Sequence, residues 1–150
     1  MTSLADEIIE AIESATDWRS IWDELLNAAF LFEKARGMAP CGWSEEVELA
    51  DITIADAARL RLAVVDFVQR TGCGSFILSK CGDQTGLKPL YTDVVRRQFD
   101  GDLNEMFQAM IALSNRGESI FPRGSASADD TDINRQLAKQ YLANIRETKA

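Results

Sequence analysis

Apolar residues recur every three to four positions along most of the chain, which is the spacing of one buried face of an α-helix. Two such stripes follow each other in the second half, separated only by the helix-breaking segment Asp100-Gly101-Asp102. The first comprises Leu87, Leu90, Tyr91, Val94, Val95 and Phe99, and the second comprises Leu103, Met106, Phe107, Met110 and Ile111. Because the connection is so short, the two helices must stack on each other to bury both stripes. A scaffold of this kind acts through its surface.

Capping residues mark further helices. Periodicity and caps together predict helices at about residues 3–15, 17–36, 53–71 and 132–148, and another that begins near Ser44. Ser3 and Asp17 are suitable N-caps, because their side-chain oxygens can accept a bond from a free N–H in the first turn. Thr53 and Asp56 are three residues apart, as in a capping box with Asp in place of Glu.

The segment Ser75–Cys81 suits either a short helix or a short buried strand, because Phe76-Ile77-Leu78 is continuously apolar. No other segment offers a partner strand, and a lone strand would leave its backbone polar groups without hydrogen bonds. We therefore predict a helix here, and an all-α fold for the chain.

Large side chains on these stripes are expected in the core. Those expected there are Trp18, Trp22, Phe30, Phe107 and Met110, and the stripe of the last helix is Ile133, Leu137, Tyr141, Leu142 and Ile145. Cys73 and Cys81 are also expected to pack in the core, and Cys41 to act as a small apolar filler in its loop.

Residues 56–117 carry a resemblance to a known family. Gly74–Asp83 looks like the end of one repeat helix with its Gly-Asp turn, Leu87-Lys88-Pro89-Leu90-Tyr91 like the entry to the next, and Met106–Gly117 like its second helix. This segment resembles a HEAT-like helical repeat. The resemblance implies an α-α right-handed superhelix and protein–protein recognition, and bacterial versions occur among small immunity and defence-associated proteins.

The expected organisation is one helical domain over residues 1–150. Its parts are acidic helices in 1–55, HEAT-like helical pairs in 56–117, a mobile loop in 118–131 and a C-terminal helix in 132–148.

The charge is unevenly distributed. The net charge is −8, yet residues 1–56 hold thirteen acids against three bases, a net of −10, and the remainder has a net of +2. An acidic half repels nucleic acid and anionic lipid, since binding to phosphates requires clustered Lys and Arg. It would attract a basic protein partner and speed the encounter at low salt. Alternatively, acidic helix faces simply keep a small protein soluble.

Two residue counts narrow the chemistry. The chain has no histidine, which removes histidine general bases, Ser–His and Cys–His dyads and nearly every common zinc site. We therefore expect no enzyme, no catalytic residue, no cofactor and no metal.

The three cysteines form no CxxC pair, and no apolar run approaches the roughly 18–20 residues that span a bilayer. The expectation is a cytoplasmic protein without membrane association.

The densest acidic segment runs from Glu45 to Asp51. Glu45, Glu48 and Asp51 are three residues apart and would share one helix face, where carboxylates could hold Mg²⁺. This order resembles half of the metal site of all-α nucleotide pyrophosphohydrolases, whose earlier Glu-x-x-Glu pair has no counterpart here. A small Mg²⁺-dependent hydrolase is therefore the alternative function.

The favoured hypothesis is protein–protein recognition through this segment. The predicted partner-binding residues are Trp43, Glu45, Glu46, Glu48 and Asp51, because an aromatic beside carboxylates is typical of interface hot spots. In its concrete form, the chain is an inhibitor of the immunity-protein kind that covers a basic partner such as a nuclease toxin. An adaptor with no toxin involved is a third possibility.

Overall fold

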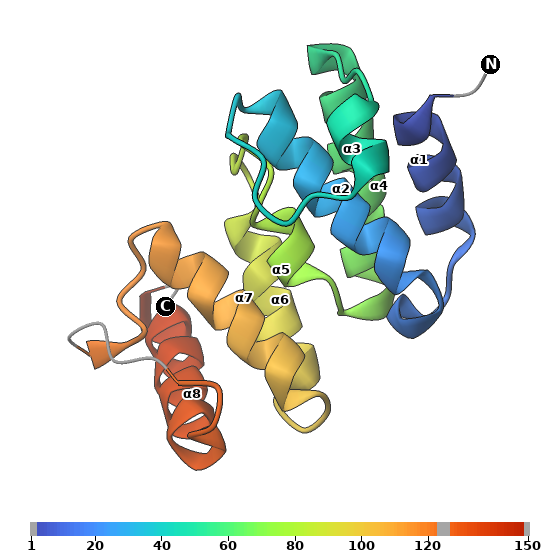
Figure 1. Cartoon of the computed structure of the whole chain (residues 1–150). Coiled ribbons are helices and arrows are strands. Elements are labelled where there is room, and N and C mark those ends of the chain that lie inside the picture. Colours follow the sequence, from blue (N-terminus) through green and yellow to red (C-terminus); the bar gives the residue numbers. More distant parts are fainter. Residues whose placement is uncertain (1–2, 123–126, 149–150) are drawn as a thin grey trace. The chain divides into compact units, whose positions relative to one another are not determined.

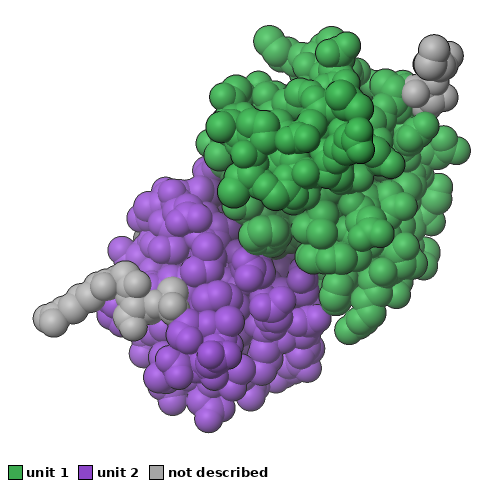
Figure 2. Space-filling view, viewed as in Figure 1, with its two compact units in different colours: residues 1–84 green, residues 85–150 purple. Residues whose placement is uncertain are grey.

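The computed structural model describes residues 3–122 and 127–148, and every regular element within these ranges is a helix (Figure 1). The predicted all-α class is confirmed. The chain divides into two compact units, Met1–Gln84 and Thr85–Ala150, which Figure 2 colours green and purple. The single domain and the HEAT-like superhelix stay predictions.

Unit 1 contains five α-helices and one 3₁₀ turn in its described part. They are α1 (Leu4–Ser14), the 3₁₀ turn η1 (Trp18–Ile21), α2 (Trp22–Ala35), α3 (Glu45–Leu49), α4 (Ile54–Thr71) and α5 (Ser75–Leu78). The predicted caps are confirmed, because Ser3 accepts a bond from the Asp6 amide and Thr53 and Asp56 form a reciprocal capping box. The ambiguous segment is helical as predicted, although α5 is only 4 residues long.

The start of α2 differs from the prediction. Asp17 caps η1, where its carboxylate accepts a bond from the Arg19 amide, and the α-helix begins only at Trp22. A 3₁₀ turn has three residues per turn, so the α-helical spacing that predicted a buried Trp22 does not apply upstream of it. Trp22 is 43% exposed, and its indole packs edge-on against Trp18 at 5.5 Å. The predictions that Trp18, Trp22 and Phe30 are core residues were wrong, since Trp18 and Phe30 are also partly exposed.

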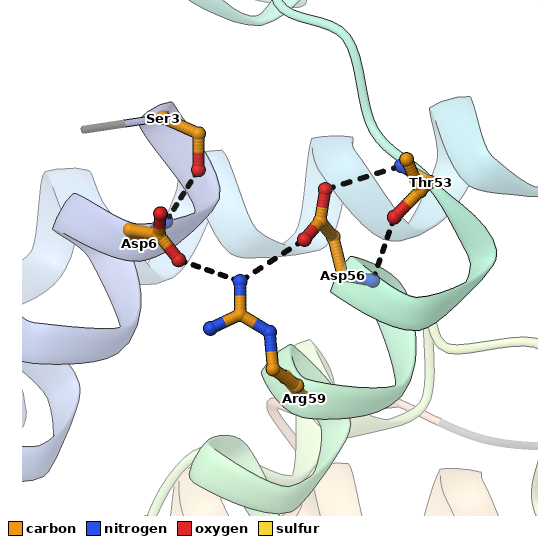
Figure 3. Close-up of polar contacts among 5 residues, drawn as sticks. All are labelled: Ser3, Asp6, Thr53, Asp56 and Arg59. Carbon is orange, nitrogen blue, oxygen red and sulfur yellow. Dashed lines mark hydrogen bonds and ion pairs between the residues drawn. The ribbon is translucent and has the colours of Figure 1, made fainter. Parts of the chain in front are cut away.

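One arginine of α4 links the first turns of α1 and α4. The Arg59 guanidinium pairs with the Asp6 carboxylate at 2.5 Å and with the Asp56 carboxylate at 3.0 Å (Figure 3). These hydrogen bonds lower the pKa of both Asp6 and Asp56 and raise the pKa of Arg59. The carboxylates therefore favour their charged form in the folded protein.

A second arginine of α4 holds the other end of α1. Arg70 donates to the carbonyl of Ala15 at 2.7 Å and to the carbonyl of Ile12 at 3.0 Å, and it also pairs with Asp66. Arg59 and Arg70 are eleven positions apart, about 16 Å along a helix, and α1 has 11 residues. The two arginines therefore span α1 and fix it parallel to α4.

Unit 2 is built on a helical hairpin, α6 (Lys88–Gln98) and α7 (Leu103–Asn115), followed by α8 (Thr131–Thr148). Asp102 caps α7 by accepting from the amides of Asn104 and Glu105. The predicted stripes are confirmed at their centres: the buried members are Leu87, Tyr91, Val94, Val95, Met106, Phe107 and Met110. Residues 123–126 of the predicted loop lie outside the described residues.

The buried face of α8 is rotated from the predicted one. Of the predicted stripe, Tyr141 is buried as expected, but Ile133 is 54% exposed, and the residues buried beside Tyr141 are Asn134 and Ala138. Two hydrogen bonds favour this face: the Tyr141 hydroxyl lies 3.1 Å from the Thr92 hydroxyl, and Asn134 donates to a loop carbonyl at 2.8 Å. A pattern of apolar residues alone does not detect such polar anchors.

The two aromatic positions of α2 provide a test of these assignments. We expect Phe32→Ala to lower the free energy of unfolding by about 3–5 kcal/mol, because a side chain only 2% exposed leaves a cavity when truncated. Trp22→Ala should lower it less, because 43% of the residue is already exposed to solvent and the change removes only its remaining buried area and one edge contact. Urea denaturation of both variants measures the difference, and equal losses would contradict the assignment.

The Arg59 cluster predicts an acid-dependent loss of stability. Because the pKa of Asp6 and of Asp56 is lowered on folding, their contribution is present above the unfolded pKa of about 4 and is lost as the pH falls through the folded values. We expect Arg59→Gln to raise both pKa values and to weaken the dependence of stability on pH below about pH 4. Carboxyl NMR titration measures the pKa values, with Arg96→Gln as a control that removes an exposed arginine elsewhere. An unchanged Asp6 titration would contradict the linkage.

Candidate functional site

The predicted partner-binding residues lie in one segment on α3 and its flanks. Ser44 caps α3 by accepting a bond from the Val47 amide, and Val47 is fully buried. Because that one side chain fastens α3 to the core, Glu45, Glu46 and Glu48 are left exposed to solvent. The arrangement presents three carboxylates on a short, anchored helix.

One part of the sequence-based interpretation needs correction. Asp51 does not share a helix face with Glu45 and Glu48, because α3 ends at Leu49 and Ala50 is extended, with φ −75° and ψ 144°. A helix of five residues is too short for Glu45, Glu48 and Asp51 to lie on one face of it. Within residues 3–122 and 127–148 there is no group of three or more Asp, Glu, Cys or His side chains that could hold a metal ion.

A lysine of α2 holds the C-terminal end of α3. The Lys34 ammonium donates to the carbonyls of Val47 at 3.0 Å and Glu48 at 2.8 Å, and also to the carbonyl of Ala50. The last carbonyls of a helix have no partner within it and carry partial negative charge, so a cation there is stabilising. Sequence reasoning missed this role of Lys34.

Two further side chains of α2 hold the start of the segment. The Trp43 indole N–H donates to the Glu33 carboxylate at 3.0 Å, and the Ser44 hydroxyl donates to the Asn27 side-chain oxygen at 3.1 Å. Trp43 is half-buried as a result, so only part of its ring is open to a partner. The segment from Trp43 to Ala50 is thus fixed to α2 at both ends.

A groove opens beside the start of α3. Its volume is about 560 Å³, and it is lined by Asp23, Leu26, Asn27, Phe30, Gly42, Ser44, Glu45 and Glu46. The lining combines three carboxylates with two partly exposed apolar side chains. This combination suits a Lys or Arg side chain, whose aliphatic part can cover apolar surface while its charged end meets carboxylates. Sequence reasoning missed the α2 side of the groove because it assigned Phe30 to the core.

The negative charge of the whole chain is concentrated in unit 1. Residues 1–84 hold fifteen acids against seven bases, a net of −8, whereas residues 85–150 hold nine of each. Five of the seven bases make hydrogen bonds that join separate segments of the unit; these are Lys34, Arg36, Arg59, Arg61 and Arg70. No ion pair among the described residues involves Glu45, Glu46, Glu48 or Asp51.

Two of the three cysteines are buried as predicted, and the third is not. Cys73 and Cys81 are buried as expected, but Cys41 is exposed and fills no space in the core. The loop that contains it leaves α2 with Gly37 at φ 77° and continues through Gly42 at φ 73°, left-handed conformations that glycine adopts readily, and residues 37–42 are all exposed.

Removal of the Lys34 ammonium tests how α3 is held. We expect Lys34→Met to speed amide hydrogen exchange in residues 45–50 by about 5–100-fold, because three carbonyls lose a charged donor. Lys80→Met is the matched control, since it removes the same charge from unit 1 without touching α3. Equal exchange in the two variants would show that the segment is held without the Lys34 ammonium.

No protein-family model, curated protein or solved structure matches the chain. Within its described part, no helix has both the length and the apolar character needed to cross a bilayer.

Proposed function

We propose that the chain is a recognition module that binds a basic protein partner through unit 1. The observation that carries the proposal is the imbalance of charge: unit 1 holds the entire net charge of −8, and no ion pair among the described residues involves Glu45, Glu46 or Glu48. Lys34, the cation that bonds to α3, donates to its backbone carbonyls and forms no ion pair with these carboxylates. A face of this kind draws cations and rejects anions.

The proposed contact surface comprises the exposed acids of α3, Trp43 and the groove beside them. Glu45 and Glu46 belong to both α3 and the groove, so a partner that rests on the helix can insert a basic side chain between α3 and α2. Trp43 supplies the amphipathic aromatic surface that interfaces favour at their centre. Because the segment is already fixed to α2, little ordering entropy is lost on binding.

In its more specific form, the proposal is an inhibitor of the immunity-protein kind. A nuclease needs a cationic groove to bind phosphates, and an acidic face that covers such a groove blocks its substrate. The acidic character of unit 1 and the HEAT-like resemblance of residues 56–117 support this choice. An adaptor that binds a basic protein without inhibiting it is the other outcome.

The experiment compares two triple charge reversals in the same unit. We expect the Glu45→Lys, Glu46→Lys and Glu48→Lys combination to slow association with a captured partner by about 10–100-fold, because electrostatic steering acts mainly on the on-rate. The control combines Glu7→Lys, Glu10→Lys and Glu13→Lys, which changes the net charge equally on exposed positions of α1. The partner is captured from native lysate, and its rates are measured by interferometry across salt.

Salt provides the second arm of this experiment. Association of the unaltered chain should slow as salt rises, since the Debye length falls to about 8 Å at 0.15 M. If the captured partner is a nuclease and the chain suppresses its activity, the result supports the inhibitor form of the proposal. If the partner keeps its activity in the complex, the result supports the adaptor form. An acidic partner, or rates indifferent to salt and to the α3 reversals, would overturn the docking surface.

A further inference from the structure

Unit 1 contains a second concavity that shares no residue with the acidic groove. It has a volume of about 290 Å³ and lies between the end of α2, the start of α4 and the turn after α5. Its lining residues are Phe32, Ala35, Arg36, Ile54, Ala57, Ala58, Arg61, Cys81, Gly82 and Asp83. The proposed recognition of a basic partner makes no use of it.

The walls of this pocket are mainly apolar. Three alanines, Ala35, Ala57 and Ala58, leave space where larger side chains would close it. Ile54 stands at the first position of α4 with 90% of its surface exposed, so an occupant could cover it. Burial raises the pKa of the Cys81 thiol, which donates to the Asp83 carbonyl at 3.2 Å and therefore lines the pocket as a neutral group.

The charged part of the lining is positive, in contrast to the rest of unit 1. Arg36 and Arg61 contribute two guanidiniums against the single carboxylate of Asp83, a net of +1 in a unit whose net charge is −8. Arg36 donates to the Lys80 carbonyl at 3.3 Å and Arg61 to the Asp83 carbonyl at 2.9 Å. These two bonds position the guanidiniums at the lining of the pocket.

Gly82 allows Arg36 to lie across the turn. A Cβ at this position would meet the Arg36 Cγ at 3.3 Å and its Cδ at 3.5 Å. The first distance is tighter than an ordinary contact, so a side chain here would require Arg36 to shift by a few tenths of an ångström. The glycine therefore lets Arg36 lie close against the turn between α5 and α6.

We propose that this pocket binds a small monocarboxylate with a hydrocarbon body. A guanidinium recognises a carboxylate through paired hydrogen bonds, and the apolar walls receive the hydrocarbon. The net charge of +1 matches one carboxylate, whereas a phosphate dianion would meet the Asp83 carboxylate without a balancing cation. At about 30 Å³ for each water-sized group, the volume admits a ligand of roughly ten heavy atoms.

The proposal is tested by NMR titration of the full chain with hexanoate, 1-hexanol and hexylammonium. We expect hexanoate to bind with an affinity of about millimolar order, as befits so small a ligand, and to shift the amides of Ala57, Ala58 and Gly82. 1-Hexanol should bind about tenfold more weakly, and hexylammonium should not saturate. Hexanoate shifts that are scattered or unsaturated at about 20 mM would overturn the site.

Two arginine variants test whether the charge of the pocket matters for binding, and one alanine variant tests whether its volume matters. We expect Arg36→Gln and Arg61→Gln each to weaken hexanoate about 3–10-fold while 1-hexanol binding is unchanged. The matched control is Arg19→Gln, which removes an equal charge from unit 1 outside the lining. Ala57→Leu should abolish binding of both probes by filling the pocket. Equal affinities for hexanoate and 1-hexanol, or arginine variants that behave like the control, would overturn the assignment of a carboxylate.

Discussion

Unit 1 depends on cations of one helix that bond to the backbone carbonyls ending another helix. Lys34 of α2 holds the end of α3, and Arg70 of α4 holds the end of α1. Arg36, which caps the end of α2, reaches the Lys80 carbonyl just after α5. Each bond satisfies acceptors that the helix leaves open and fixes two helices relative to each other. The helices α1, α3 and α5 have only 11, 5 and 4 residues, and helices so short are marginal without such tertiary support.

This use of its few bases determines the electrostatic character of the unit. Most of these cations donate to backbone carbonyls, and the acids on α3 form no ion pair among the described residues. The same principle leaves two guanidiniums at the apolar pocket, because Arg36 and Arg61 are also held by carbonyls. The acidic surface of α3 and the positive lining of the pocket therefore share one feature, which is that the nearby cations bond to backbone carbonyls.

The sequence predicted what depends on local chemistry. The helical class, the Ser3 cap, the Thr53 and Asp56 capping box and the centres of the unit 2 stripes follow from residue types at fixed spacing. What it did not predict depends on contacts between distant residues. The burial of Asn134 on α8 depends on its bond to a loop carbonyl, and the end of α3 is held by Lys34, which lies well upstream in the chain. The acidic segment could be found from composition, but its α2 wall could not, because helical spacing placed Phe30 in the core.

The acids of α3 affect the stability of that helix in different ways. Carboxylates in a first turn favour a helix, which explains Glu45 and Glu46 as readily as a binding role does. Glu48 also belongs to the first turn, because α3 has only 5 residues, but it stands one residue before the end of the helix, where an acid opposes the helix dipole. Lys34 offsets this cost by bonding to the carbonyls around it, the Glu48 carbonyl included. This short helix can therefore carry three acids because a cation of α2 supports its C-terminal end.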